Sequence, residues 1–234
     1  MRITLFLLCG ALGLGIVSLT GCNGDSEVAL APSFPEGTGQ EPAGAKPYPN
    51  GPYGVAKGSV IANYKFVGYP NALKDSETLQ EIELAEFYNP TADTLYEEGS
   101  VMEVGTPKPT ALLLTVSAIW CGPCNYEADK VFPGLYEDYK PKGGEFFVQL
   151  ADGATPGKAA NAKALRSWTD TYEVDYPMAI DPSYQLGALF EADAFPANMV
   201  IDTRTMRIVE VTSGAPEPGS SFWKTFENVI EGQD

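Results

Sequence analysis

The clearest pattern in the chain is an alternation of apolar runs and amphipathic segments from residue 111 onward. Residues 111–119 read Ala-Leu-Leu-Leu-Thr-Val-Ser-Ala-Ile, an almost continuous apolar run that predicts a strand buried on both faces. A helix is predicted after it, because four large side chains recur at the i, i+3, i+4 and i+7 spacing of one helix face: Phe132, Leu135, Tyr136 and Tyr139.

The pattern continues toward the C-terminus. Three more strands and a second helix are predicted at residues 146–150, 176–180, 197–201 and 158–172. Residues 206–211 are expected to pair with the last of these strands as a hairpin. A final helix should end before Gly232, a residue that favours helix ends. Its apolar face consists of Phe222, Trp223, Phe226, Val229 and Ile230.

Strand–helix alternation that ends in a hairpin and a helix is typical of an α/β fold with helices flanking a mixed sheet. Upstream, an imperfect alternation between Val60 and Phe66 predicts an early strand, and residues 82–87 predict another short element. We therefore place the folded domain at residues 58–234 and treat residues 58–108 as an N-terminal extension of it.

Residues 1–21 have the pattern of a signal peptide. Behind a positively charged start, residues 3–17 form an uncharged apolar run that is too short to span a bilayer. The run ends in Leu19-Thr-Gly-Cys22, which resembles the bacterial lipobox, so we expect cleavage before Cys22 and acylation of that residue. An ordinary signal peptide is the alternative. Residues 22–57 are rich in Gly and Pro and predict a flexible tether.

Composition excludes several kinds of chemistry. The chain has 15 Lys+Arg against 31 Asp+Glu, and the resulting charge of −16 disfavours a nucleic-acid partner. Histidine is absent, which excludes Ser–His and Cys–His pairs and His-ligated zinc or copper. Of the four cysteines, Cys9 leaves with the signal peptide and Cys22 carries the lipid. Cys121 and Cys124 are then the thiols that remain in an oxidising compartment.

These two thiols stand in Trp120-Cys121-Gly122-Pro123-Cys124, between the first buried strand and its helix. A cysteine at a helix N-terminus faces unpaired backbone N–H groups and the positive end of the dipole, which stabilise a thiolate. The two-residue spacing places Cys124 one turn behind, where it can attack a mixed disulfide on Cys121. Pro123 costs nothing in the first helical turn. The motif therefore predicts a redox-active disulfide.

Two structural alternatives fit the motif less well. A purely structural disulfide would close a very short loop and would constrain the unfolded chain little. Half of a zinc site would lack the histidines or the second cysteine pair that complete four ligands. We expect neither a metal nor any cofactor besides the Cys121–Cys124 disulfide.

Trp120 to Cys124 match the thioredoxin active-site pentapeptide, and residues 58–234 resemble the membrane-tethered thiol–disulfide oxidoreductases of the ResA/TlpA type. The resemblance implies a thioredoxin-like three-layer sandwich, with a mixed central sheet, an N-terminal strand extension and a central insertion. It also implies two further site residues. Glu127 matches an acidic residue that the family carries three positions after the second cysteine. Pro196 matches the family's cis-proline, which helps to bind the backbone of the partner.

Several positions depart from the family pattern. Thr115 stands where cytosolic thioredoxin has a buried acid, and Phe195 precedes the proline where relatives have a small or hydroxylated residue. The proline that often interrupts the active-site helix is displaced to Pro133. With no histidine and no acid at position 115, Glu127 is the best-placed proton acceptor for Cys124. The alternative is a surface acid that the helix dipole favours.

Together these residues predict thiol–disulfide exchange in which Cys121 attacks and Cys124 resolves. The dipeptide between them matches reducing thioredoxins, so we favour a reductase of protein disulfides. A peroxiredoxin-like peroxidase and a non-catalytic thioredoxin-fold binding lipoprotein are the alternatives. Residues 117–120 do not match the peroxidase signature, and the intact cysteine pair argues against binding alone. The missing histidine disfavours copper delivery.

The expected partners are protein thiols and disulfides in the bacterial cell envelope, and a membrane protein that donates electrons. The lipid on Cys22 would hold the domain to the membrane, facing the periplasm or the exterior. Asn23 follows that cysteine, whereas an aspartate there retains enterobacterial lipoproteins in the inner membrane. By that analogy the outer membrane stays open as the location.

Overall fold

The structure is a computed structural model that describes residues 47–74, 78–186 and 195–233. The predicted signal peptide, Cys22 and the tether up to residue 46 lie outside these ranges. The chain divides into two units, and all described residues belong to the second, Gly39–Asp234. Within the described residues, no helix has the length and apolar character needed to cross a membrane.

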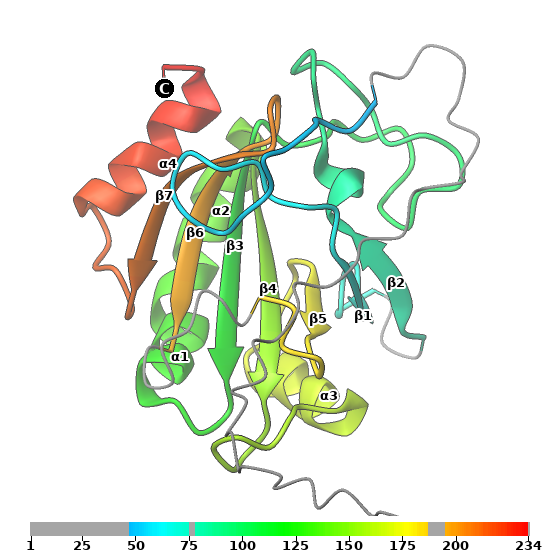
Figure 1. Cartoon of the computed structure of the whole chain (residues 1–234). Helices are drawn as coiled ribbons and strands as arrows, with labels where there is room; N and C mark the ends of the chain where they lie inside the picture. Colours follow the sequence, from blue (N-terminus) through cyan, green and yellow to red (C-terminus); the bar gives the residue numbers. More distant parts are fainter. Residues whose placement is uncertain (1–46, 75–77, 187–194, 234) are drawn as a thin grey trace, which may run out of the picture. The chain divides into compact units, whose positions relative to one another are not determined.

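In the described part of the chain, seven strands form one mixed sheet in the order β2-β1-β5-β4-β3-β6-β7 (Figure 1). Strands β3, β4 and β5 are parallel, and the other neighbours pair antiparallel. The strands are β1 (Lys65–Tyr69), β2 (Gln80–Glu83), β3 (Ala111–Ala118), β4 (Gly144–Asp152), β5 (Met178–Ile180), β6 (Ala197–Asp202) and β7 (Arg207–Ser213).

Helices connect and cover these strands. They are η1 (Leu84–Phe87), α1 (Gly122–Tyr126), the π-helical turn η2 (Glu127–Val131), α2 (Phe132–Tyr139), η3 (Lys140–Lys142), α3 (Ala162–Thr171) and α4 (Ser221–Glu231). The chain therefore crosses from β3 to the parallel strand β4 through one helical segment, which begins at the cysteine motif. The α/β class and the mixed sheet predicted from the sequence are confirmed.

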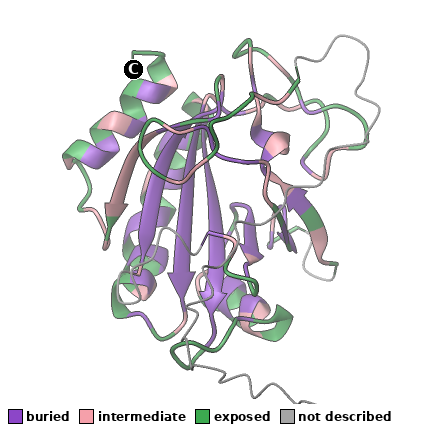
Figure 2. Cartoon of the chain, viewed as in Figure 1, coloured by how far each residue is buried: buried purple, intermediate pink, exposed green. Residues whose placement is uncertain are grey.

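The two faces of the sheet bury different parts of the chain. On one face, an aromatic cluster joins α2, β4 and α4 through Tyr139, Phe146 and Phe226. On the other face, Phe66 of β1 and Phe87 of η1 pack against Phe147 of β4. The N-terminal extension thus supplies the cover for the face opposite the helices α2 and α4. Because they are covered on both faces, β3, β4 and β6 are buried along their whole length (Figure 2).

Most predicted elements match the structure, and their ends differ for local reasons. The second helix begins at Ala162 rather than 158, because the side chain of Asn161 accepts the N–H of Ala164 and caps it. The early strand lies at Lys65–Tyr69, later than the expected 60–66. Within this strand, Gly68 leaves no room for a Cβ, which would clash with the carbonyl oxygen of Met178 in β5.

The described residues before position 58, which the sequence assigns to the tether, contact the domain. The Tyr48 hydroxyl donates to the carbonyl of Ile61 at 2.9 Å, and the N–H of Gly54 donates to Val60 at 3.0 Å. Burial raises the pKa of Tyr48 well above its ordinary value. The part of the predicted tether that begins at residue 47 therefore packs on the domain.

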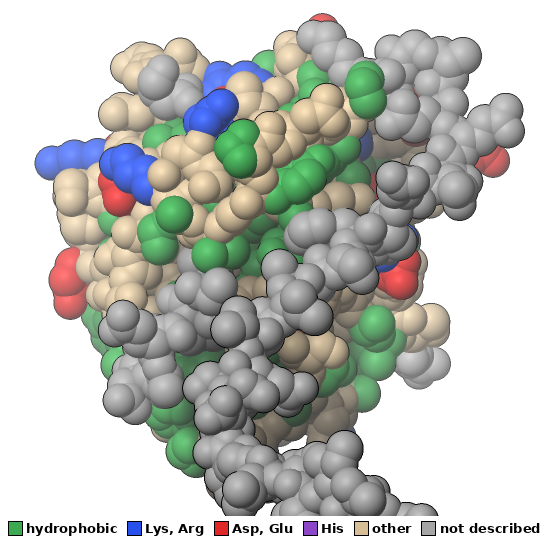
Figure 3. Space-filling model, viewed as in Figure 1, with side chains coloured by type: hydrophobic (Ala, Val, Ile, Leu, Met, Phe, Trp, Pro, Cys, Tyr) green, Lys and Arg blue, Asp and Glu red, His purple; other side chains and the backbone are tan. Residues whose placement is uncertain are grey.

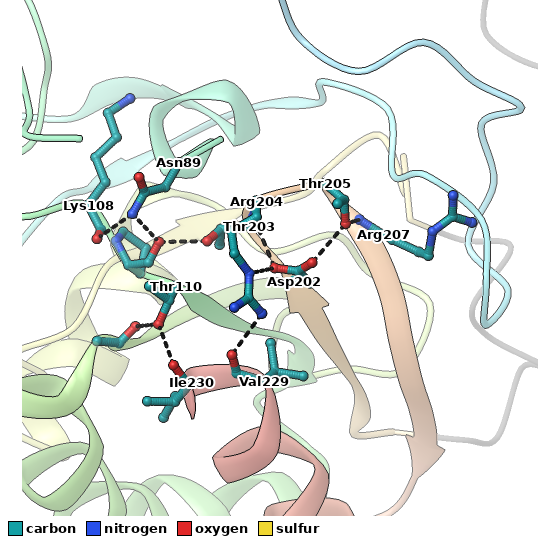
Figure 4. A network of polar contacts seen from close by, with 12 residues as sticks. Asn89, Lys108, Thr110, Asp202, Thr203, Arg204, Thr205, Arg207, Val229 and Ile230 are labelled. Carbon is teal, nitrogen blue, oxygen red and sulfur yellow. Dashed lines mark hydrogen bonds and ion pairs between the residues drawn. The ribbon is translucent and has the colours of Figure 1, made fainter. Parts of the chain in front are cut away.

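A polar network holds the end of the sheet where β3 begins (Figure 4). Arg204 binds Asp202 at 2.6 Å and donates to the carbonyl of Val229 at 2.9 Å. The Thr110 hydroxyl donates to the carbonyl of Ile230 at 3.2 Å. In Figure 3, Lys and Arg side chains gather over α4 and the β6–β7 turn, at this same end. The network fixes α4 on the sheet at the end opposite the cysteines, which follow the far end of β3.

Candidate active site

The two motif cysteines lie where the buried strand β3 ends and α1 begins, and they form a disulfide with Cα atoms 5.3 Å apart. Cys121 is the N-cap residue of α1, and its sulfur accepts the backbone N–H of Cys124 at 3.1 Å. Both side chains are nearly covered, with 3% of Cys121 and 1% of Cys124 exposed. Exposure alone therefore does not show which of the two is the attacking cysteine. The N–H that points at the sulfur of Cys121 is the feature that favours a thiolate there.

The backbone of the cysteine loop is braced from within the helical segment. The side-chain amide of Asn125 donates to the carbonyl oxygens of Ile119 at 3.0 Å and of Cys121 at 2.6 Å. Its oxygen accepts the hydroxyl of Tyr172, which follows α3. These hydrogen bonds hold the loop on the end of β3 and connect it to Tyr172, which follows α3.

Trp120 is held beside the disulfide by a carboxylate at the end of the neighbouring strand. Its indole N–H donates to Oδ2 of Asp152 at 2.9 Å, and the same oxygen accepts the N–H of Gly157 at 2.7 Å. The hydroxyl of Tyr184 donates to the other carboxylate oxygen, which raises the pKa of Tyr184 to about 12. The Trp120 ring meets Phe195 edge-on at 5.6 Å between centroids. These contacts fix an aromatic surface next to the cysteines.

Pro196 reaches the same end of the sheet through the pairing of β3 with β6. In this antiparallel register Val116 lies opposite Ala197, so Pro196 precedes β6 just where β3 approaches the cysteine loop. The Phe195–Pro196 peptide bond is cis, in agreement with the cis-proline that the resemblance implies. The carbonyl oxygen of Pro196 accepts the N–H of Gly214 at 2.8 Å.

Glu127 begins the π-helical turn that separates α1 from α2. The N–H of Phe132 donates to the carbonyl of Glu127, five residues back, in place of the ordinary four. Pro133 follows at once and has no N–H for an α-helical bond to residue 129, which favours an irregular turn at this point. The turn lets the carboxyl of Glu127 lie fully buried, so the alternative of a surface acid is wrong.

The environment of Glu127 favours its neutral form. Burial raises the pKa of this carboxyl from 4.5 to about 8, and the hydrogen bond from Asn198 opposes that rise. The amide of Asn198 donates to Oε1 at 3.0 Å. Among the described residues, Oε2 has no hydrogen-bond partner. Near neutral pH this group therefore holds a proton.

The structure brings all the predicted site residues of the domain to one end of the sheet, and it adds three that the sequence analysis did not single out. Asn125, Asp152 and Asn198 are polar residues that bind the cysteine loop, Trp120 and Glu127. A signal for two of them was present. Asn198 interrupts an apolar strand, and Asp152 ends one that is parallel to β3. Lipidation of Cys22 lies outside the described residues.

Ligands for a metal do not converge at this site. Within the described residues, no group of three or more Cys, Asp or Glu side chains has the arrangement of a metal site. The chemistry the geometry offers is that of two sulfurs, a buried carboxyl group and the exposed aromatic surface of Trp120.

Comparison with known proteins supports this description. No protein-family model matches the chain. The thiol–disulfide oxidoreductase ResA of Bacillus cereus is 26% identical over 117 residues, which cover 50% of this chain and 62% of the relative. ResA of Bacillus anthracis matches over the same lengths with the same identity. The chain thus spans about three fifths of the length of the curated relatives it matches.

Solved structures share the fold. A Chlorobium tepidum protein assigned as a thiol:disulfide interchange protein DsbE matches with a TM-score of 0.52 and 15% identity, over 76% of this chain and 99% of that one. A hypothetical protein from Sinorhizobium meliloti 1021 matches with a TM-score of 0.52 and 17% identity, over 78% of this chain and 88% of that one. The chain therefore has a thioredoxin-like fold.

The buried carboxyl of Glu127 makes the stability of the oxidised protein depend on pH. An unfolded glutamate titrates near 4.5 and the folded one near 8, so between these values the folded state holds a proton that the unfolded state releases. Stability therefore falls as pH rises through this window. A tenfold difference in proton affinity is worth about 1.4 kcal/mol, so the loss amounts to several kcal/mol.

Glu127→Gln should remove this loss. Between pH 5 and pH 9 the free energy of unfolding of the variant should therefore fall less than that of wild type. Urea unfolding of the oxidised proteins at both pH values measures the difference. The exposed residue Glu98 supplies the control, because Glu98→Gln should keep the wild-type trend. Parallel pH profiles for wild type and Glu127→Gln would contradict the burial of an ionisable group at this position.

Proposed function

We propose that this chain, a relative of the thioredoxin-like thiol–disulfide oxidoreductases of the ResA type, exchanges disulfides with other proteins through Cys121 and Cys124. The observation that carries the proposal is the disulfide itself, with the sulfur of Cys121 at the N-terminus of α1 and in reach of a backbone N–H. The cis-proline and the aromatic surface of Trp120 lie at the same end of the sheet, where an extended partner segment would bind.

In the reducing direction, the thiolate of Cys121 attacks a disulfide of the partner protein. One partner sulfur leaves as a thiolate, and a mixed disulfide forms on Cys121. Cys124 then loses its proton and attacks the sulfur of Cys121. The partner leaves with its second sulfur reduced, and the Cys121–Cys124 disulfide forms. Two electrons have passed from the dithiol to the partner.

Glu127 exchanges a proton with Cys124 in both directions of the disulfide exchange. When Cys124 resolves the mixed disulfide, the ionised carboxylate accepts its proton. When an electron donor reopens the oxidised pair, Cys124 leaves as a thiolate, and the neutral carboxyl returns the proton. The pKa of about 8 in the oxidised state supports this second role, because the carboxyl is then protonated at neutral pH.

We further propose that the protein is a lipoprotein of the bacterial cell envelope that works as a reductase. Cys22 in its lipobox-like tetrapeptide supports the anchor, and the Gly122-Pro123 dipeptide supports the reducing direction. Its substrates would be protein disulfides, and its electrons would come from a membrane protein.

Trapping tests the exchange reaction. Cys124→Ser removes the resolving thiol, so partner proteins should accumulate as mixed disulfides on Cys121, visible on non-reducing gels and identified by mass spectrometry. Cys121→Ser is the matched control and should trap far fewer. In the reduced wild-type protein, iodoacetamide should modify Cys121 first, because its thiolate is stabilised. Faster labelling of Cys124, or equal trapping by both variants, would reverse the assignment.

Stopped-flow reduction of a model disulfide tests Glu127. Glu127→Gln should leave the attack by Cys121 nearly intact and slow resolution by about 10²-fold. In wild type the resolution rate should rise with pH as the carboxylate forms, and this rise should be absent from the variant. Glu98→Gln again serves as the control for loss of an acidic charge. If resolution rates superimpose across pH, water is the base and Glu127 has no part in the reaction.

Cys22→Ala tests the anchor. The variant should lose membrane association or remain unprocessed, whereas wild type should be recovered in the membrane fraction with its processing blocked by globomycin. A mature N-terminus at another residue, found by mass spectrometry, would exclude Cys22 as the lipidated residue.

A further inference from the structure

The side-chain amide of Asn198 is held in one orientation by two groups from neighbouring strands. The carbonyl oxygen of Gly214, next to β7, accepts from its Nδ2 at 3.2 Å. The hydroxyl of Thr115 in β3 donates to its Oδ1 at 2.6 Å. A carbonyl oxygen only accepts hydrogen bonds, so the NH₂ end of the amide must lie on the side of Gly214. Asn198 and Thr115 are both buried.

This orientation decides what Glu127 meets. The same Nδ2 donates to Oε1 of Glu127 at 3.0 Å, and the amide has no freedom to turn an acceptor toward the carboxyl. The bond favours Oε1 as an acceptor in both protonation states. The proton of the neutral carboxyl then resides on Oε2, the oxygen without a hydrogen-bond partner among the described residues.

We propose that Asn198 is a positioning residue for proton transfer, whose amide holds Oε1 of Glu127 so that Oε2 is the oxygen that exchanges the proton with Cys124. The proposal rests on the proposed function of Glu127. Thr115 contributes to the same orientation, because its hydroxyl donates to Oδ1 at the other end of the Asn198 amide. The residue that replaces the buried acid of cytosolic thioredoxin thus acts on the carboxyl through Asn198.

Among the described residues, Tyr176 is a titratable side chain that the charge of Glu127 affects. Burial raises the pKa of Tyr176, which precedes β5, well above its ordinary value, and the charges of Asp175 and Glu127 add to the rise. Tyr176 therefore stays neutral between about pH 6 and 9. The cysteine pair on the preceding helix α1 titrates only when it is reduced. Among the described residues at the site, the group expected to titrate in this range in the oxidised protein is Glu127.

The chain offers a matched control at the other end of the domain. Asn89 is also fully buried, and its amide donates to the carbonyl oxygens of Lys108 and Pro109 at 3.0 and 3.1 Å and accepts the N–H of Thr94 (Figure 4). Asn89→Leu and Asn198→Leu each remove three side-chain hydrogen bonds from equally buried sites. The first leaves Glu127 untouched.

The experiment titrates Glu127 directly in the oxidised full-length protein, by ¹³C NMR of side-chain-labelled glutamate, with the signal assigned through Glu127→Gln. Loss of a hydrogen bond to the charged form should raise the pKa of Glu127 by about one pH unit or more in Asn198→Leu. Asn89→Leu should leave it at the wild-type value. The pH at which resolution accelerates in stopped flow should move upward by the same amount in Asn198→Leu.

A second pair of variants covers the case in which Asn198→Leu does not fold. Thr115→Val keeps the shape of the side chain but releases Oδ1 of the amide, and it should shift the titration in the same direction by less. Thr203→Val removes a comparably buried hydroxyl, which donates to Pro109, and should cause no shift.

An unchanged Glu127 titration in the variants of Asn198 and Thr115 would overturn the role of Asn198. A shifted titration combined with identical resolution rates in wild type and Glu127→Gln would overturn the proposal by a different route. In that case the hydrogen bond acts on Glu127 as described, but the proposed function of Glu127 has failed.

Discussion

The site depends on the pairing of β3 with β4 on one side and β6 on the other. In this register the carboxyl end of β3, the carboxyl end of β4 and the start of β6 meet at one end of the sheet. Each brings a group of the site: the cysteine loop from β3, Asp152 from β4, and Pro196 with Asn198 from β6. A shift of one residue in β6 would turn Asn198 to the other face of the sheet, away from Glu127.

The second constraint is burial. Because β3, β4 and β6 are covered on both faces, a buried polar side chain among them is stabilised when it finds a hydrogen-bond partner inside the protein. Thr115, Asn198 and the carbonyl of Gly214 do so, and the carboxyl of Glu127 is drawn into the same set. Its second oxygen remains without a partner in the described residues, and desolvation keeps the group protonated near neutral pH. The hydrogen bonds that order this part of the core are therefore also the ones that reach the carboxyl of Glu127.

Much of the fold and of the site was predictable from local patterns, and the failures have a common cause. The buried strands, the hairpin, the last helix with its stop at Gly232 and the cysteine pair at a helix start all follow from residues close in sequence. The position of β1 was misjudged, because its partners β2 and β5 decide where the strand runs and the alternation around it is weak. The packing of Tyr48 onto Ile61 could not be seen in a stretch whose composition resembles a linker. Asn125 and Asp152 were missed because each acts on a loop backbone or a ring that only the folded chain places beside it.

The sequence by itself determined which residues are the candidates for the chemistry, since thiol spacing, helix-start geometry and the offset of Glu127 are properties of a few consecutive residues. Only the tertiary structure decided how Glu127 behaves. Its burial, and with it its protonation, arises because the π-helical turn packs against a sheet that includes β6, a strand far from the turn in sequence. Its hydrogen-bond donor lies 71 residues away in sequence. A pKa depends on solvent exclusion and on the orientation of neighbouring dipoles, and both exist only once the strands have paired.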